Sequence, residues 1–222
     1  MANPTARRIA AVAGASGLVG RCLVERLCAD PAVAQVHALV RRELPLRHAK
    51  LRSHVVDFAA LPALPAINEV YLALGTTIKV AGSQAAFRAV DFDANLAVAQ
   101  AALAAGARRA GLVSALGASA RSSVFYSRVK GELEEALAAL PFEALVIARP
   151  SMLRGDRHAL GQPVRGGELL WARLDAVMRP VIPRRLRSIA AADVAAALVR
   201  SVPAARGREV LDSAAMQGAA SS

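Results

Sequence analysis

The stretch from Ile9 to Gly20 constrains the fold more than any other part of the chain. It begins as a short apolar run, breaks at Gly14, and continues from Leu18 with the apolar spacing of a helix, with glycine again at position 17. This order predicts a buried strand, a tight turn and a helix. Unpaired N–H groups at the start of such a helix can bind a phosphate, and glycine lets the backbone approach it closely. A turn of this kind without a ligand also favours glycine, so both interpretations stay open.

Short apolar runs alternate with helical patterns through residues 8–150. The expected strands cover residues 9–13, 36–40, 54–57, 70–74, 111–114 and 145–148, and the expected helices begin near residues 18, 83 and 125. Runs that are apolar throughout are typical of strands covered on both faces. The sequence therefore predicts an α/β fold with a doubly wound parallel sheet of the Rossmann type, in a single domain over residues 1–222.

The last third of the chain is less regular, and we expect residues 151–222 to form a small C-terminal lobe that is not an independent domain. Its expected elements are helices over residues 168–178 and 191–202, an edge strand over 208–211 and a disordered tail from 218. Ligands of open parallel sheets bind at the carboxyl ends of the strands. The lobe is thus expected to close the substrate cleft, with Arg154 and Arg157 favouring an anionic small molecule; a solvated face is the alternative.

Composition restricts the compartment and the partners. No run of 18 apolar residues is free of charges or glycine, so we predict no membrane-spanning helix and no membrane partner. Arg7 and Arg8 before an apolar run resemble a secretory signal, but glycine and serine interrupt that run. Cys22 and Cys28 fit neither a metal pair nor a disulfide, which favours free thiols and a cytoplasmic location. The four histidines show no ligand spacing, so no metal is expected.

The positive charge is the strongest bias in the composition. Lysine and arginine together number 28 against 17 acidic residues, giving a net charge of +11, and nine arginines against three acids fall between positions 149 and 187. Such a charge could serve a nucleic acid or an acidic small molecule. Because the arginines are scattered rather than gathered in a run, we favour no nucleic-acid partner.

Tyr126 and Lys130 form the most suggestive chemical pair. Four residues are about one helical turn, so both side chains lie on one face of the helix expected from residue 125. A nearby ammonium favours the phenolate form of tyrosine, which makes the phenol a usable proton donor or acceptor. Ser114, at the end of the preceding strand, can bond to the same substrate oxygen. An exposed helix end with no catalytic role is the alternative interpretation.

Taken in order, these motifs resemble the short-chain dehydrogenase/reductase superfamily over roughly residues 8–200. The closest resemblance is to small atypical members, similar to the Tat-interacting-protein-like oxidoreductases and to bacterial nucleoside-diphosphate-sugar-epimerase-like proteins. The motifs that carry it are Gly14-Ala-Ser-Gly-Leu-Val-Gly20, Leu74-Gly-Thr-Thr77, Val90-Asp-Phe-Asp93, Ser114-Ala-Leu-Gly-Ala118, Tyr126-Ser-Arg-Val-Lys-Gly-Glu132 and Arg149-Pro-Ser151.

The resemblance implies a role for each matching residue. A catalytic set of Ser114, Tyr126 and Lys130 is implied, with Lys130 also on the nicotinamide ribose. The residues that it places around a bound dinucleotide are Gly14, Ser16, Gly17, Leu18, Val19 and Gly20 at the pyrophosphate, Asp57 at the adenine, Gly75 and Thr76 at the ribose, and Pro150 and Ser151 at the nicotinamide. One departure stands out, because Asp91 occupies the region where many members carry an asparagine that relays protons.

Arg41 and Arg42 bear on the choice of cofactor. They end the second expected strand, where an acidic residue would bond both ribose hydroxyls of NAD. A guanidinium can instead clamp a 2′-phosphate, so we predict NADP(H) in preference to NAD(H), a solvated pair being the alternative. The expected function is an NADP(H)-dependent reductase or epimerase-like enzyme acting on a small substrate, as a monomer or homodimer. A regulatory module that senses NADPH with little turnover is the competing hypothesis.

Overall fold

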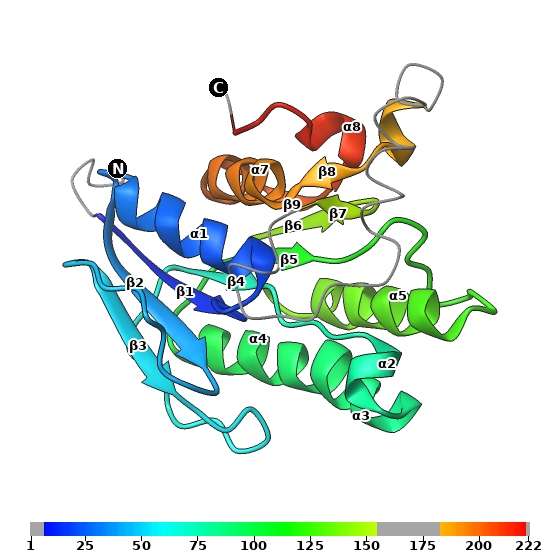
Figure 1. Cartoon of the computed structure of the whole chain (residues 1–222). Coiled ribbons are helices and arrows are strands. Elements are labelled where there is room, and N and C mark those ends of the chain that lie inside the picture. Colours follow the sequence, from blue (N-terminus) through cyan, green and yellow to red (C-terminus); the bar gives the residue numbers. More distant parts are fainter. Residues whose placement is uncertain (1–6, 155–182, 221–222) are drawn as a thin grey trace.

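The computed structural model describes residues 7–154 and 183–220, and shows a twisted sheet with helices on both faces (Figure 1). The sheet has seven strands in the order β3-β2-β1-β4-β5-β6-β9, and each neighbouring pair is parallel. The order reverses direction between β1 and β4, which is the switch point at which doubly wound folds bind ligands. The predicted α/β fold of the Rossmann type is confirmed.

The elements follow the predicted alternation of strands and helices. The strands are β1 (Arg8–Ala13), β2 (Val33–Val40), β3 (Leu51–Val55), β4 (Glu69–Leu72), β5 (Arg109–Val113), β6 (Ala144–Arg149), β7 (Leu153–Arg154), β8 (Ile189–Ala190) and β9 (Gly207–Asp212). The helices are α1 (Leu18–Ala29), α2 (Ile78–Ala81), α3 (Gln84–Arg88), the π-helix η1 (Ala89–Ala94), α4 (Asn95–Ala104), α5 (Phe125–Ala138), the 3-10 helix η3 (Arg184–Leu186), α7 (Ala191–Ala204) and α8 (Ser213–Met216).

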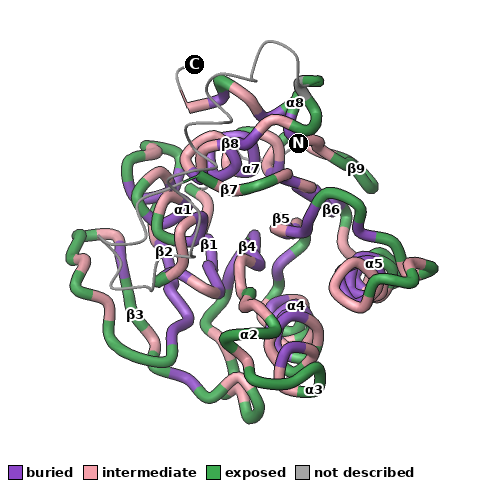
Figure 2. Tube along the Cα trace, turned by 45° about the vertical axis from the view of Figure 1, so that its right-hand side comes forward, coloured by how far each residue is buried: buried purple, intermediate pink, exposed green. Residues whose placement is uncertain are grey.

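Two aliphatic cores hold the three layers together. Between the sheet and the helices α1 and α7 lies a core that includes Leu23, Leu27 and Leu198, all with no exposed surface. Val98 and Leu133 belong to the second core, which lies between the sheet and the helices α4 and α5. The central strands are buried on both faces, whereas the edge strand β9 is largely exposed (Figure 2). The continuous apolar runs in the sequence reflect this double coverage.

Three local predictions need correction. The third strand covers residues 51–55 rather than 54–57, because its pairing with β2 begins at Leu51. The helix expected to begin near residue 83 is divided, since a π-turn over 89–94 separates α3 from α4. Residues 218–220 of the expected disordered tail are ordered: the Ala220 amide donates to Asp193 and Ala219 is buried in the core beside α7.

The described part of the C-terminal lobe packs on the main sheet. Helix α7 contributes to the first core, and β9 pairs with β6 as the predicted edge strand. A small parallel pair, β7 and β8, lies beyond the end of β6. The expected helix over residues 168–178 and the side chain of Arg157 lie outside the described residues.

Candidate dinucleotide and catalytic site

The glycine turn after β1 is set by close backbone packing. Gly14 has a φ of 85°, and a side chain there would overlap the Ala73 carbonyl and lie 2.8 Å from the Leu74 amide nitrogen. A side chain on Gly20 would overlap the Gly14 carbonyl and lie 3.0 Å from the Ala15 Cα. Two of the three glycines are therefore required by the approach of α1 to the strand ends, with or without a ligand.

Gly17 leaves the N-terminus of α1 open. Its amide donates to the Gly14 carbonyl at 2.9 Å, and it occupies the N-cap position without a capping side chain. Ser16 is exposed, Leu18 is half-buried, and no acidic residue stands in the first turn. A helix N-terminus without such partners presents N–H groups and partial positive charge to an anion.

The two arginines after β2 are free to meet a ligand. Arg41 and Arg42 are both exposed, and the described part of the chain gives neither an ion pair nor a side-chain hydrogen bond. Asp57 lies beyond the end of β3, where it is exposed and its Oδ1 accepts from the Ala59 amide at 2.9 Å. It caps a turn there.

The loop after β4 is fastened to the π-turn. Asp91 accepts a hydrogen bond from the Thr76 amide at 2.8 Å, through Oδ2. Asn95 donates to the carbonyl groups of Leu74, Val90 and Asp91, although its own Oδ1 is buried and accepts nothing from the described residues. This set of bonds fixes the backbone of the loop beside the glycine turn.

Lys130 is buried against Asp91. The Lys130 Nζ and Asp91 Oδ1 lie 2.8 Å apart, with the two side chains 5% and 1% exposed. The contact is an ion pair. A methyl group built on Gly75 would lie 3.5 Å from Asp91 Oδ1 and 3.9 Å from Lys130 Nζ. The ammonium thus lies directly beneath the loop after β4.

Tyr126 lies one turn before Lys130, at the start of α5. It is half-buried, and its ring packs on Phe87 with ring centroids 5.5 Å apart. Phe87 is fully buried in α3, so the tyrosine ring has a rigid neighbour. Tyr126 and Lys130 are both brought to the carboxyl edge of the sheet, since α5 follows β5.

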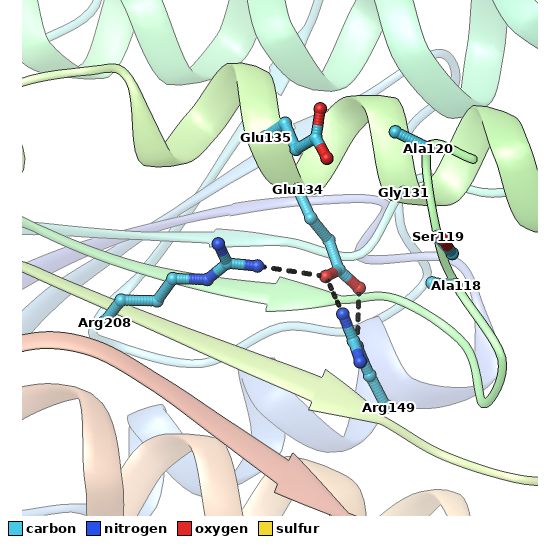
Figure 3. Close-up of a pocket in the computed structure, with 8 residues that line it drawn as sticks. All are labelled: Ala118, Ser119, Ala120, Gly131, Glu134, Glu135, Arg149 and Arg208. Carbon is cyan, nitrogen blue, oxygen red and sulfur yellow. Dashed lines mark hydrogen bonds and ion pairs between the residues drawn. The ribbon is translucent and has the colours of Figure 1, made fainter.

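Ser114 is directed beneath α5, toward a buried carboxylate. Its hydroxyl donates to Glu134 Oε1 at 2.6 Å, and Glu134 is 1% exposed. Arg149 donates to both oxygens of the same carboxylate, from Nε at 3.0 Å and from Nη2 at 2.5 Å (Figure 3). These hydrogen bonds to Glu134 raise the pKa of the Arg149 guanidinium. The structure records no contact between Ser114 and Tyr126, so their joint action on one oxygen stays a prediction.

Pro150 and Ser151 link the end of β6 to the C-terminal lobe. The Pro150 carbonyl accepts from the Leu116 amide at 2.8 Å. The Ser151 amide donates to the Ser213 hydroxyl at 2.8 Å, and the Ser213 hydroxyl donates to the Ser151 hydroxyl oxygen at 3.1 Å. The Ser151 hydroxyl donates to the Arg187 carbonyl, so both polar groups of Ser151 have partners. Arg154 follows in β7 and is exposed.

The predicted residues gather on one edge of the sheet. Gly14 contacts the end of β4, Gly75 follows β4, and Lys130 lies under Gly75, so the glycine turn and the start of α5 flank the same loop. Sequence patterns gave no role to Glu134 or Asn95, because their partners come from distant elements. Asp91 was noticed only as a departure, and its pairing with Lys130 was not foreseen.

Comparison with protein families matches residues 14–167 to a family described as NAD(P)H-binding. Curated fungal relatives are similar to the chain in sequence. The chain is 39% identical over 152 residues to "Protein FMP52, mitochondrial" of Eremothecium gossypii, covering 67% of this chain and 68% of the relative. The chain belongs to the NAD(P)H-binding family. A second FMP52 protein, from Candida albicans, is 31% identical over 77% of this chain and 80% of its own length.

Solved structures similar to this NAD(P)H-binding protein support the fold. MoeE5 in complex with UDP-glucose and NAD has a TM-score of 0.66 at 21% identity, covering 91% of this chain and 74% of its own. The Helicobacter pylori ADP-L-glycero-D-manno-heptose-6-epimerase has a TM-score of 0.68 at 14% identity, covering 96% and 78%. The predicted NAD(P)-binding domain of the Rossmann type is confirmed, with MoeE5 and an epimerase among its structural neighbours.

The relatives correct one prediction about this NAD(P)H-binding protein. The cytoplasmic location inferred from the cysteines is wrong, because the curated FMP52 relatives are named as mitochondrial. Free thiols are compatible with both compartments, so they do not distinguish between them. Both cysteines are free, and burial raises the pKa of each thiol.

Within residues 7–154 and 183–220, no helix is long and apolar enough to cross a bilayer. In the same residues, no three His, Cys, Asp or Glu side chains lie close enough together to hold a metal ion.

Proposed function

We propose that this protein is an NADP(H)-dependent oxidoreductase or epimerase-like enzyme that acts on a small substrate with Tyr126 and Lys130. One observation carries the proposal. The open glycine turn and the buried Lys130 lie on either side of one loop, at the carboxyl edge of a sheet in a family that binds NAD(P)H. This arrangement would bring a dinucleotide and a proton-transfer residue to the same place.

The residues present fit a dinucleotide. The uncapped N-terminus of α1 at Gly17 suits a pyrophosphate, because its amides have no competing side chain or acidic neighbour. Gly14, Ser16, Leu18, Val19 and Gly20 would surround that group. Two further sets would complete the site: Asp57, Gly75 and Thr76 for the nucleoside portions, and Pro150 and Ser151 on the nicotinamide side.

NADP(H) is the form of the cofactor that we propose. Arg41 and Arg42 are exposed at the end of β2, with no acidic partner among the described residues to neutralise them. Charge-assisted hydrogen bonds of this kind contribute about 1.5–3 kcal/mol. A 2′-phosphate would supply the acceptors that these guanidinium groups lack.

The protein side chains would transfer a single proton to or from the substrate. The bound nicotinamide would donate or accept the hydride. Tyr126 would give its phenolic proton to a substrate oxygen, or take one from a substrate hydroxyl, and its packing on Phe87 fixes the ring for that transfer. Lys130 would bring positive charge close to the phenol, and Asp91 would hold the ammonium in position.

Cofactor titration tests the proposal directly. NADPH should bind at least tenfold more tightly than NADH, since tenfold corresponds to about 1.4 kcal/mol. Replacing both Arg41 and Arg42 with alanine should remove the preference, and Arg47→Ala, an exposed arginine of the same connection, should keep it. Equal affinities in the wild type, or a preference that survives the double replacement, would disprove the choice of cofactor.

Turnover needs its own experiment. With NADPH and a panel of carbonyl substrates, Tyr126→Phe should lower the rate by about 10²–10⁴ while the affinity for NADPH stays nearly unchanged. A Tyr126→Phe protein that reduces a substrate at the wild-type rate would remove Tyr126 from the catalytic role.

A regulatory module that senses NADPH is the second candidate. The observation in its favour is that Ser114 donates its hydroxyl proton to Glu134, so that the serine can offer a substrate carbonyl no proton while this bond lasts. NADPH binding without turnover of any compound in the panel would favour this candidate over the enzyme.

A further inference from the structure

Glu134 is a buried carboxylate for which the proposed reaction has no use. Its side chain is 1% exposed. It accepts hydrogen bonds from Ser114, in the connection between β5 and α5, from Arg149 in β6 and from Arg208 in β9. Its Oε2 serves two guanidinium groups, with Nη2 of Arg149 at 2.5 Å and Nη2 of Arg208 at 3.4 Å (Figure 3). The two arginines therefore share one negative charge.

Both arginines keep hydrogen-bond donors that the network does not use. The bonds recorded involve Nε and Nη2 of Arg149 and only Nη2 of Arg208. A guanidinium has five N–H donors, so Nη1 of Arg149 and both Nε and Nη1 of Arg208 lack an acceptor in the described part of the chain. The two side chains are 31% and 43% exposed, so a ligand can reach them.

A groove of about 320 Å³ opens at this cluster. Its lining consists of Ala118, Ser119, Ala120, Gly131, Glu134, Glu135, Arg149 and Arg208. The wall formed by residues 118–120 is fixed, because a side chain on Gly131 would overlap the Ser119 backbone and the Ser119 amide donates to the Ser127 carbonyl at 3.0 Å. The groove thus combines a preformed wall of small residues with a pair of guanidinium groups.

The groove lies apart from the glycine turn. It opens over β6 and β9, whereas the glycine turn follows β1, and β4 and β5 lie between them in the sheet. Its nearer neighbour is the nicotinamide side of the proposed cofactor site, because Arg149 directly precedes Pro150 and Ser151, and Glu134 is turned only about 40° around α5 from Lys130. Whether a ligand in the groove and a dinucleotide bind independently is therefore part of the test.

Charge selects the class of ligand. The guanidinium groups of Arg149 and Arg208 are balanced by the carboxylates of Glu134 and of the exposed Glu135, so the groove favours a singly charged ligand over a strongly charged anion. We propose that this groove is a second ligand site, which binds the carboxylate of a small organic acid between Arg149 and Arg208 and its apolar part against Ala118 and Ala120. A dianion such as phosphate would bind more weakly, because it meets more repulsion from Glu135 for the same donors.

Benzoate is a suitable probe, because it joins a carboxylate to an apolar ring. It would be titrated by calorimetry up to about 50 mM, above the millimolar affinity expected of a small fragment, with benzamide and inorganic phosphate in parallel. Repeating each titration with saturating NADPH separates this site from the dinucleotide site. We expect benzoate to bind in both conditions, and more tightly than benzamide or phosphate.

Three variants locate the binding. Arg208→Gln should weaken benzoate about tenfold, because a charge-assisted bond is lost, and Glu135→Gln should strengthen it about twofold to threefold. Arg200→Gln, at an exposed arginine of α7, is the matched control and should change nothing. Glu135→Gln leaves the hydrogen bonds of Glu134 intact, so its benzoate affinity still tests the site if Arg208→Gln fails to fold.

Three results would overturn the proposal. They are no heat of binding in the wild type, equal affinities for benzoate and benzamide, and an affinity unchanged in both Arg208→Gln and Glu135→Gln. In any of these cases Glu134 and its arginines serve only to join α5 to β6 and β9. None of these results depends on whether NADPH binds or turns over.

Discussion

Replacing Asp91 with asparagine would show how much the buried ion pair contributes to the protein. The change removes one charge at nearly constant volume, and the amide oxygen of asparagine can still accept from the Thr76 amide. Lys130 would then be left 5% exposed with an unpaired ammonium. Removing one partner of a buried pair costs about 3–5 kcal/mol. We expect Asp91→Asn to lower the free energy of unfolding by that amount.

Equilibrium denaturation in urea measures this effect, and a double-mutant cycle isolates it. Lys130→Met should also destabilise the fold, because it leaves the Asp91 carboxylate without its counter-charge. The double variant buries no net charge, so it should be at least about 2 kcal/mol more stable than the sum of the single changes implies. Asp93→Asn, an exposed acid of the same π-turn, is the control and should lie within about 0.5 kcal/mol of the wild type.

The cycle can contradict the reasoning in two ways. A cost below about 1 kcal/mol for Asp91→Asn would mean that water or a rearranged Lys130 satisfies the ammonium. A coupling energy close to zero would mean that the two side chains contribute to stability independently. Asp91 would then not be the residue that positions Lys130 for Tyr126.

Three further predictions concern stability. Gly20→Ala should lower the free energy of unfolding in urea by about 1–3 kcal/mol or more, because the new methyl group overlaps the Gly14 carbonyl. Gly17→Ala should lower it by less than about 1 kcal/mol, because its methyl group would lie 3.3 Å from that oxygen. Equal losses in the two variants would contradict the packing argument. Burial, with His54 and Arg52 nearby, lowers the pKa of His37, so its neutral form stabilises the fold above the ordinary histidine pKa of about 6.5, and that contribution is lost as the pH falls from there through the folded value. Thermal denaturation should show stability falling with pH across this range in the wild type and in His48→Gln, by no more than about 1.4 kcal/mol per pH unit, and falling less in His37→Gln. Tyr71→Phe removes a buried hydrogen bond of 3.1 Å to Glu69 and should lower the free energy of unfolding, measured by thermal denaturation, by about 0.5–1.5 kcal/mol. An unchanged stability would mean that this hydrogen bond makes no net contribution to the fold.

The surroundings of the residues predicted for the cofactor followed from the sequence more fully than those of the residues predicted for catalysis. The exposure of Arg41 and Arg42 follows from their place at the end of a strand, and the open N-terminus of α1 follows from Gly17. Ser114 was placed correctly at the end of its strand, but its side-chain partner was not predicted, because Glu134 lies in a different element. The cellular location was predicted wrongly, since composition does not encode it.

The sequence by itself determined the order and type of the elements. Strand and helix periods, and the glycines after the first strand, are local signals, because they depend on residues a few positions apart. Only the tertiary structure decided which polar groups meet. Asp91 on the π-turn contacts Lys130 on α5, and Glu134 on α5 binds Ser114, which follows β5, and Arg149 in β6. Such buried pairings depend on how helices pack over the sheet, and a buried charge or hydroxyl must find its partner wherever that packing places one.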